Sequence, residues 1–221
     1  MNKIIVITGA NRGIGLAMAK HFKQQGDRVY ALCRQSSVEL KHLSVSVVEG
    51  VDVATDGGIN NMVKALSGVS VDVLVCNAGI LRDENLEDFN GDSIREQFEV
   101  NALAPLRVVH ALQNHLVRGA KVAMITSRMG SIADNDSGGR YGYRMSKAAL
   151  NAAAVSLSKD LLSQKISVGI YHPGYVQTDM VNHGGDISAD IAAGRLLGLI
   201  NELNLGHSGV FKHSNGQVLP W

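Results

Sequence analysis

Short apolar runs alternate along the chain with longer segments of mixed polarity. Most of these runs are apolar at every position rather than at every second one, which is typical of strands covered on both faces. They predict strands at residues 3–8, 28–33, 43–51, 71–76, 120–126 and 166–171. Each interval between them is long enough for a helix, as in the helical pattern at residues 14–25.

This alternation predicts an α/β fold. Strands that alternate with helices form a parallel sheet, and right-handed crossovers place the helices on both of its faces. The expected fold is therefore a doubly wound parallel sheet, a three-layer αβα sandwich of the Rossmann type. No linker, repeat or low-complexity stretch interrupts the pattern, so we expect residues 1–221 to form a single domain. Ligands of such sheets bind beyond the carboxyl ends of the strands.

The composition narrows the range of partners. A formal net charge of +1 over 221 residues, without a run of like charges, gives no sign of a nucleic-acid partner. No apolar stretch is long enough for a signal peptide or a membrane span, so we expect a cytoplasmic protein without a membrane partner. Cys33 and Cys76 are expected to be buried free thiols. Neither Cys-x-x-Cys nor His-Glu-x-x-His occurs, so we expect no metal site.

A glycine-rich segment joins the first predicted strand to the first predicted helix. Residues 8–15 read Thr-Gly-Ala-Asn-Arg-Gly-Ile-Gly, with the spacing Gly-x-x-x-Gly-x-Gly. Glycines permit a tight turn and let backbone amides approach a pyrophosphate at the N-terminus of a helix. A turn that merely connects two elements is the alternative. The flanking strand and helix favour a dinucleotide-binding loop.

The end of the second predicted strand indicates which dinucleotide is bound. A carboxylate at this place would bind the ribose 2′-hydroxyl of NAD. The chain has Cys33-Arg34 instead, and Arg12 lies in the glycine loop. Two guanidinium groups without a carboxylate suit the 2′-phosphate of NADP(H), because arginine binds phosphate through a planar fork. The alternative is that Arg34 is an ordinary solvated residue.

Tyr143 and Lys147 lie four residues apart in a segment, residues 143–162, that is predicted to be helical. This spacing places a phenol and an ammonium group on one helix face, where the ammonium lowers the pKa of the phenol. Such a phenol can exchange a proton with a carbonyl or alcohol oxygen. Surface packing is the usual reason for a pair of this kind, but the dinucleotide loop favours chemistry. Ser127 ends a predicted strand, where its hydroxyl would point toward the ligand.

Together these motifs resemble the short-chain dehydrogenase/reductase family over essentially the whole chain. Asp52-Val53, Asn77-Ala78-Gly79 and Pro173-Gly174 are similar to the other cofactor motifs of that family. The cofactor-binding residues that the resemblance implies are Gly9, Asn11, Arg12, Gly13, Ile14, Gly15, Arg34, Asp52, Val53, Asn77, Ala78, Gly79, Tyr143, Lys147, Pro173, Gly174, Val176 and Thr178. The catalytic residues that it implies are Asn101, Ser127, Tyr143 and Lys147.

Within the family, residues 143–151, residues 172–180 and the Leu219-Pro220-Trp221 ending resemble the C-factor and sniffer group most. That resemblance implies NADPH-dependent reduction of aldehyde or ketone carbonyls, with Tyr143 as the proton donor. Lys147 would also bind the nicotinamide ribose, and Asn101 would hold a water that links Lys147 to solvent. Two alternatives stay open, an NADPH-binding regulatory protein with little turnover and an NAD-dependent enzyme that oxidises a secondary alcohol.

Two role assignments stay open in the sequence. Ser131 competes with Ser127, and we favour Ser127 because it directly follows the predicted strand. Asp52 is assigned to the adenine end of the cofactor, but an aspartate before a helix also serves as an N-cap.

The substrate side and the assembly are predicted in outline. Residues 181–188 are expected to form a short lid with Gly184-Gly185 as its hinge, which predicts acceptance of broad or bulky carbonyls. The candidate pocket residues are Met129, Tyr175 and Met180, and a core or surface position is the alternative for each. The helix at residues 143–162 carries small residues that relatives use to form a homodimer or homotetramer, and these are Ala148, Ala149, Ala152 and Ala153. Packing of that helix on its own sheet is the alternative.

Overall fold

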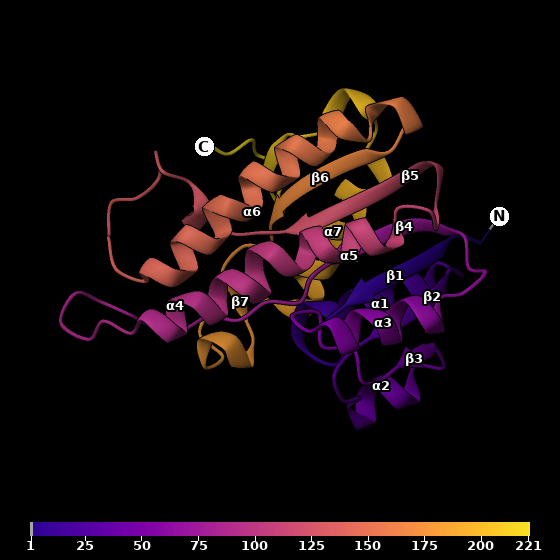
Figure 1. The fold of residues 1–221 in the computed structure, drawn as a ribbon, viewed down its shortest axis with the longest axis horizontal. Coiled ribbons are helices and arrows are strands. Elements are labelled where there is room, and N and C mark those ends of the chain that lie inside the picture. The colour runs from indigo at the N-terminus through magenta and orange to yellow at the C-terminus, as the bar shows by residue number, and fades with distance from the viewer. Residues whose placement is uncertain (1) are drawn as a thin grey trace.

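The computed structural model describes residues 2–221, so Met1 of the predicted domain lies outside the described residues (Figure 1). Seven parallel strands form one sheet in the order β3-β2-β1-β4-β5-β6-β9. The strands of this sheet are β1 (Ile4–Thr8), β2 (Arg28–Leu32), β3 (Ser46–Val48), β4 (Val71–Cys76), β5 (Leu116–Ile125), β6 (Ser167–His172) and β9 (Phe211–His213). The short strands β7 (Val176–Gln177) and β8 (Ile187–Ser188) pair with each other separately. The predicted parallel sheet is confirmed.

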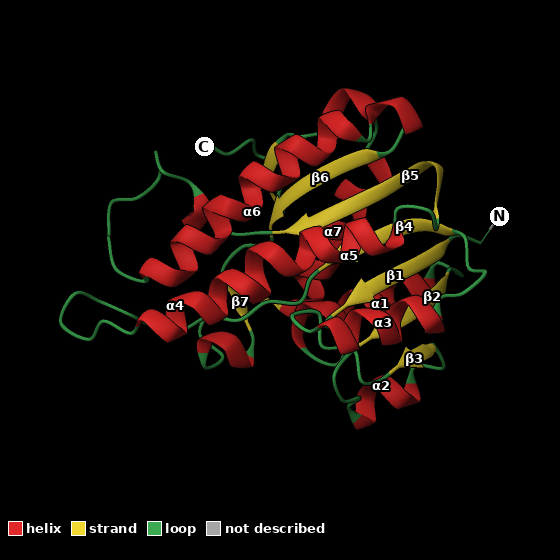
Figure 2. Cartoon of the chain, in the orientation of Figure 1, coloured by secondary structure: helices red, strands yellow, loops and turns green. Residues whose placement is uncertain are grey.

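Helices cover both faces of the sheet, as Figure 2 shows. They are α1 (Gly13–Gln24), α2 (Val38–His42), α3 (Asp56–Ala65), α4 (Gly91–Phe98), α5 (Ala104–Leu112), α6 (Tyr141–Asp160) and α7 (Ala189–Glu202). Side chains of β1 alternate between the two layers, because Ile5 and Ile7 pack with Met18 of α1 while Val6 packs with Met62 of α3. This alternation divides the core into two apolar clusters, one on each face of the sheet.

The direction of strand addition reverses between β1 and β4. The chain first adds β2 and β3 on one side of β1, and then crosses to place β4, β5 and β6 on the other side. The chain leaves β1 and β4 toward opposite faces of the sheet, which creates a crevice beyond the carboxyl ends of these two strands. The close approach of the two loops is visible at Gly9, where an added β-carbon would lie 2.9 Å from the Cα of Ala78.

The predicted strands differ from the observed ones mainly at their ends. The predicted strand at residues 43–51 is a strand of the sheet only over β3, and the apolar residues around it, such as Val45 and Val51, pack in the core. Strand β5 begins at Leu116, four residues early, because it pairs with Val71 before a shift in register. Strand β9 was not predicted, since three residues are too few to give a pattern.

The described helices include none that is long and apolar enough to cross a lipid bilayer.

Candidate active site

The glycine loop after β1 has a conformation that only glycine adopts without strain. Gly9 and Gly13 have φ angles of +66° and +54°. A β-carbon on Gly15 would lie 2.2 Å from the carbonyl oxygen of Gly9. The loop is therefore a cradle of bare backbone, and it leads into the N-terminus of α1, where Arg12 occupies the N-cap position without a side-chain cap. This geometry fits a pyrophosphate, because the first amides of a helix have no partner within the helix.

Asn77 fixes the end of β4 to this loop. Its amide nitrogen Nδ2 donates to the carbonyl oxygens of Thr8 and Gly9 at 3.1 and 3.0 Å. The hydroxyl of Thr8 accepts hydrogen bonds from the backbone nitrogens of Asn77 and Ala78 at 3.1 and 3.2 Å. The side chain of Asn77 thus bonds the loop itself, so it positions the cofactor side through the backbone. Ala78 and Gly79 follow it along the crevice.

Arg34 is exposed at the end of β2, and no ion pair of its guanidinium is found among residues 2–221. The sequence predicted that the guanidinium groups of Arg12 and Arg34 both bind the 2′-phosphate. In the structure Arg12 is in an ion pair instead, because its Nη1 lies 2.9 Å from Oδ2 of Asp179. The sequence pattern could not show this pairing, since Asp179 comes from the distant segment after β7. Of these two guanidinium groups, Arg34 is therefore the one without an ion pair among residues 2–221.

Asp52 does not cap α3. The N-cap residue is Thr55, whose hydroxyl accepts a hydrogen bond from the nitrogen of Gly58 at 3.1 Å. The carboxylate of Asp52 accepts from the nitrogen of Ala54 at 3.0 Å and so shapes the turn after β3. Val53 is buried in that turn. The helix-cap alternative for Asp52 is wrong, and the role at the adenine end stays a prediction.

Tyr143, Lys147 and Ser127 are brought together by α6 and the end of β5. Tyr143 is 8 % exposed and Lys147 is 4 % exposed, and the ammonium nitrogen of Lys147 lies 5.7 Å from the centroid of the Tyr143 ring. Lys147 donates to the carbonyl oxygen of Ile125 at 3.0 Å. Ser127 is within hydrogen-bond reach of the Tyr143 phenol. A phenol, a hydroxyl and an ammonium group thus converge at one edge of the sheet.

The pKa of Tyr143 is raised, whereas its spacing to Lys147 predicted that it would be lowered. Burial raises the pKa of the phenol, while the hydrogen bond with Ser127 and the charge of Arg140 act in the opposite direction. Burial also lowers the pKa of Lys147 to about 8. Desolvation disfavours the charged form of each group, and it is the largest cause of both shifts. Tyr143 is therefore a protonated phenol at neutral pH, the form that a proton donor needs.

The two serines that competed in the sequence have different environments. The Oγ of Ser127 accepts from the nitrogen of Met129 at 3.1 Å and also reaches Tyr143. The Oγ of Ser131 instead accepts from the nitrogen of Asp134 at 3.1 Å, in the turn beyond. The geometry therefore favours Ser127 over Ser131 as the hydroxyl beside Tyr143.

Asn101 is fully buried in a π-helical turn, Glu99–Leu103, between α4 and α5. Its Oδ1 accepts from the nitrogen of Ile80, and its Nδ2 donates to the carbonyl oxygen of Ile80 and to the hydroxyl of Ser146. A β-carbon on Gly79 would lie 3.1 Å from Oδ1 of Asn101 and 3.6 Å from Nζ of Lys147. Asn101 therefore holds the segment that packs beside Lys147, and its predicted role in holding a water stays a prediction.

The segment after β6 returns over the glycine loop. Gly174 has a φ angle of +102°, which turns the chain after Pro173 toward Val176 in β7. A β-carbon on Gly13 would lie 3.3 Å from the methyl group of Thr178. The pair β7–β8 closes the base of the predicted lid. Gly185 is packed against β7, since a β-carbon there would lie 2.7 Å from the nitrogen of Gln177. This glycine therefore permits the close approach of the predicted lid to β7.

Sequence reasoning missed several buried polar residues around the site. Glu84 is 3 % exposed although it lies in a polar loop, and the ring of His172 packs edge-on against His213 at 5.0 Å. Burial lowers the pKa of His172 to about 3, so that ring is neutral. An ionisable residue in a polar loop gives no sign in the sequence that it is buried.

In the described part of the chain, no group of three or more His, Cys, Asp and Glu residues is placed to hold a metal ion.

Comparison with known proteins gives one consistent result. A family model described as short chain dehydrogenase matches residues 3–186. The chain is 36 % identical over 223 residues to the 1-hydroxy-2-glutathionyl-2-methyl-3-butene dehydrogenase of Rhodococcus sp. (strain AD45), with 98 % of this chain and 99 % of that protein covered. It is 43 % identical over 159 residues to the C-signal protein of Myxococcus xanthus, with 68 % and 93 % covered.

A solved structure extends the likeness to three dimensions. The NADPH-bound carbonyl reductase from chicken fatty liver superposes with a TM-score of 0.89 at 27 % identity, with 100 % of this chain and 99 % of that chain covered. The resemblance to the C-factor and carbonyl-reductase group, first drawn from the motifs, is confirmed.

Proposed function

The chain belongs to the short-chain dehydrogenase family, and on that premise we propose that it is an NADPH-dependent reductase of aldehyde or ketone carbonyls. The observation that carries this proposal is the convergence of Tyr143, Ser127 and Lys147 beside a bare-backbone cradle at the switch point of the sheet. The likeness to an NADPH-bound carbonyl reductase supports the same cofactor and reaction.

The proposed cofactor site runs along the crevice from Arg34 to Thr178. Arg34 would bind the 2′-phosphate, and the cradle formed by Gly9 and Gly15 would hold the pyrophosphate. Thr178, which packs over the glycine loop, would bind the carboxamide of the nicotinamide. The bound cofactor supplies the hydride, and the chain supplies position and proton.

The proposed proton donor is the phenol of Tyr143. Ser127 would hold the carbonyl oxygen by its hydroxyl and so align it with the phenol. As the oxygen gains negative charge, the phenol proton passes to it and a phenolate remains. The Lys147 ammonium, charged below its pKa of about 8, stabilises that phenolate until a proton is replaced. Burial of all three side chains excludes bulk water and strengthens these interactions.

The reverse reaction is the second candidate. A relative that covers nearly the full chain is named as a dehydrogenase of a hydroxy compound, and the same three side chains suit oxidation when the phenol is deprotonated. The raised pKa of Tyr143 favours reduction near neutral pH, because the phenol then holds its proton.

The test is optical. Purified protein is mixed with NADPH or NADH and a panel of aldehydes, ketones and quinones, and the loss of reduced cofactor is followed. We expect turnover with NADPH well above that with NADH. Tight NADPH binding without turnover on any carbonyl, and without NADP reduction by secondary alcohols, would contradict the proposal and favour a regulatory NADPH-binding protein.

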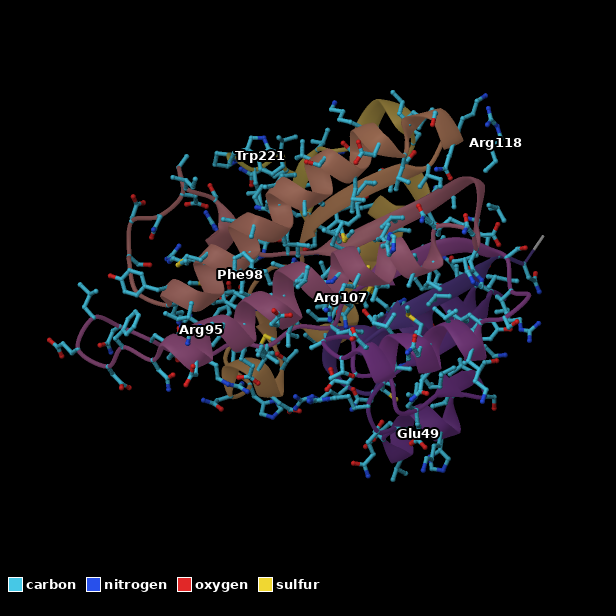
Figure 3. The ribbon with its side chains drawn as sticks, in the orientation of Figure 1. Glu49, Arg95, Phe98, Arg107, Arg118 and Trp221 are labelled. Atoms are coloured by element: carbon cyan, nitrogen blue, oxygen red, sulfur yellow. The ribbon has the colours of Figure 1, made fainter. Side chains whose placement is uncertain are left out.

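We propose that the protein is a homodimer or homotetramer formed through α4 and α6. Phe98 at the end of α4 is 43 % exposed, and Met145 on α6 is 53 % exposed. Figure 3 shows Phe98 on α4 next to α6. Ala152 on α6 is exposed, so small residues let a second helix pair approach. A monomeric mass in light scattering at micromolar concentration would contradict this assembly.

We also propose that the protein works in a reducing compartment such as the cytoplasm. Cys33 and Cys76 are both free and buried. Such thiols persist where disulfides do not form.

A further inference from the structure

A cavity of about 330 Å³ lies between two polar loops next to the proposed catalytic residues. One wall is formed by residues 83–85 after β4, and the opposite wall by residues 137–140 before α6. Met129 also lines the cavity, and its nitrogen donates to Oγ of Ser127 at 3.1 Å. One lining residue of the cavity is thus hydrogen-bonded to the hydroxyl that is proposed to hold the substrate oxygen. Its volume is within the range of small-molecule sites.

A residue that lines this cavity, and a second residue bonded to its lining, each have a buried polar atom without a partner. Among the described residues, the buried side-chain atoms that lack a hydrogen bond are Oε2 of Glu84, Nη1 of Arg144 and Nδ1 of His172. Glu84 lines the cavity. Arg144 binds the opposite wall, where its guanidinium donates to Oγ of Ser137 at 2.8 Å and to the carbonyl oxygen of Gly138 at 3.3 Å. An unpaired buried acceptor and an unpaired buried donor each destabilise the free protein.

The carboxylate of Glu84 is fixed by α4. Its Oε1 accepts hydrogen bonds from the hydroxyl of Ser93 and from the amide nitrogen of Gln97. The same oxygen would lie 3.2 Å from a β-carbon on Gly142, so the carboxylate also packs against the first turn of α6. Because Oε1 is occupied in this way, Oε2 is the oxygen that remains for a ligand. No ion pair of Glu84 occurs within residues 2–221.

The opposite wall offers hydrogen-bond donors. Arg140 pairs with Asp83 through Nε, and its two terminal nitrogens make no hydrogen bond within the described chain. The backbone nitrogen of Arg140 also donates to the carbonyl oxygen of Glu84 at 2.8 Å, which ties the two walls together. The cavity is therefore lined by Glu84, which has an unpaired carboxylate oxygen, and by Arg140, which has unpaired guanidinium nitrogens.

We propose that this cavity is a substrate subsite for a polar arm that carries both an N–H donor and an oxygen acceptor, such as an amide or an amino-acid group. The N–H donates to Oε2 of Glu84, and the oxygen accepts from Arg140. The subsite deepens the proposed reductase function and rests on it, since the carbonyl of the same substrate lies at Ser127 and Tyr143. Glu84 is then a specificity-determining residue, outside the groups that move the proton.

The test compares two aryl ketones that differ in one atom of the arm, an amide and its ester, in the wild type, Glu84→Gln and Glu87→Gln. The wild type should prefer the amide by roughly tenfold or more in kcat/KM, because only the amide supplies a donor to the unpaired acceptor Oε2 of Glu84. In Glu84→Gln an NH₂ group replaces Oε2, so kcat/KM should fall more for the amide than for the ester and the preference should disappear. Glu87 is exposed in the same loop, and its variant should keep the preference.

Three results would overturn the subsite. They are equal use of amide and ester by the wild type, an equal loss on both substrates in Glu84→Gln, and loss of the preference in Glu87→Gln. The first needs no variant, so it decides the matter even if Glu84→Gln fails to fold in a thermal melt. Calorimetric binding of the amide and ester arms without the ketone separates this proposal from the function. If binding prefers the amide arm in a way that depends on Glu84, but no ketone is turned over, the result would contradict the reductase function and support the subsite.

Discussion

On the glycine-loop side of the active site, polar groups bond to one another, whereas on the cavity side buried polar atoms are left without partners. Asn77 and Thr8 satisfy the backbone of the loop with hydrogen bonds of 3.0 to 3.2 Å. Glu84 and Arg144 each keep one buried atom unpaired. The cofactor side is thus preformed by the chain alone, whereas we infer that the substrate side is completed by its ligand.

The comparison predicts that the cofactor side tolerates almost no added atom. In Gly15→Ala, the new β-carbon would lie 2.2 Å from the Gly9 oxygen and 2.6 Å from Nδ2 of Asn77, so the loop must shift. We expect NADPH binding to weaken by roughly 100-fold, from about 3 kcal/mol of overpacking. Gly57→Ala is the control, because nothing lies within 4 Å of its added carbon. Fluorescence titration with NADPH checks both, and wild-type affinity in Gly15→Ala would show that the loop is not a rigid cradle.

Replacement of Ser127 and of Ser131 by alanine should affect different properties, the first catalysis and the second stability. We expect Ser127→Ala to lower kcat by about 100-fold, as for loss of one hydrogen-bond donor to a developing oxyanion. Ser131→Ala should lower the free energy of unfolding by about 1 kcal/mol, because it removes the acceptor of the Asp134 nitrogen, with kcat nearly unchanged. Steady-state kinetics and denaturant unfolding of both variants decide, and a larger kcat loss in Ser131→Ala would reverse the assignment.

Cofactor preference should depend on Arg34 more than on Arg12. We expect Arg34→Asp to lower the ratio of kcat/KM for NADPH over NADH by roughly 10- to 100-fold, since a charge-assisted bond to phosphate becomes a repulsion. Arg12→Gln should change the ratio by no more than about threefold, because its guanidinium is in an exposed pair with Asp179. If Arg12→Gln had the larger effect, the 2′-phosphate would lie on the other side of the glycine loop.

The smallest effect is a dependence on pH. Burial lowers the pKa of Lys147 to about 8, so its charge is present below that pH and is lost as the pH rises through it. We expect kcat/KM for NADPH to fall roughly three- to tenfold above pH 8, as one favourable charge is removed from the site. Lys147→Arg keeps its charge at every pH used, and its pH profile should lack this fall. A fall that persists in the arginine variant would assign it to another group.

Sequence reasoning predicted most of the cofactor side because backbone geometry there demands particular residues. A positive φ at Gly9 and a close approach at Gly15 admit only glycine, so the spacing of the loop is visible in the sequence. The strands β1 and β4 were placed within one residue, since continuous apolar runs mark strands buried on both faces.

The substrate side could not be predicted in this way. Glu84 is buried through contacts with Ser93 and Gln97 of a helix that follows it, and the pattern of a polar loop contains no sign of that packing. The pairing of Arg12 with Asp179 joins segments 167 residues apart. The direction of the pKa shift of Tyr143 depends mainly on the burial of its side chain. The spacing between Tyr143 and Lys147 in the sequence contains no information about that burial.

The most direct test of the account is the effect of Tyr143→Phe on carbonyl reduction, measured beside NADPH affinity in the same variant. Tyr143 is proposed to donate the proton, and the phenyl ring fills nearly the same volume without the hydroxyl. The account predicts a loss of kcat/KM for the best carbonyl by at least about 100-fold, with the dissociation constant of NADPH changed little. Turnover within a few-fold of the wild type would contradict the assignment of Tyr143 and the mechanism built on it.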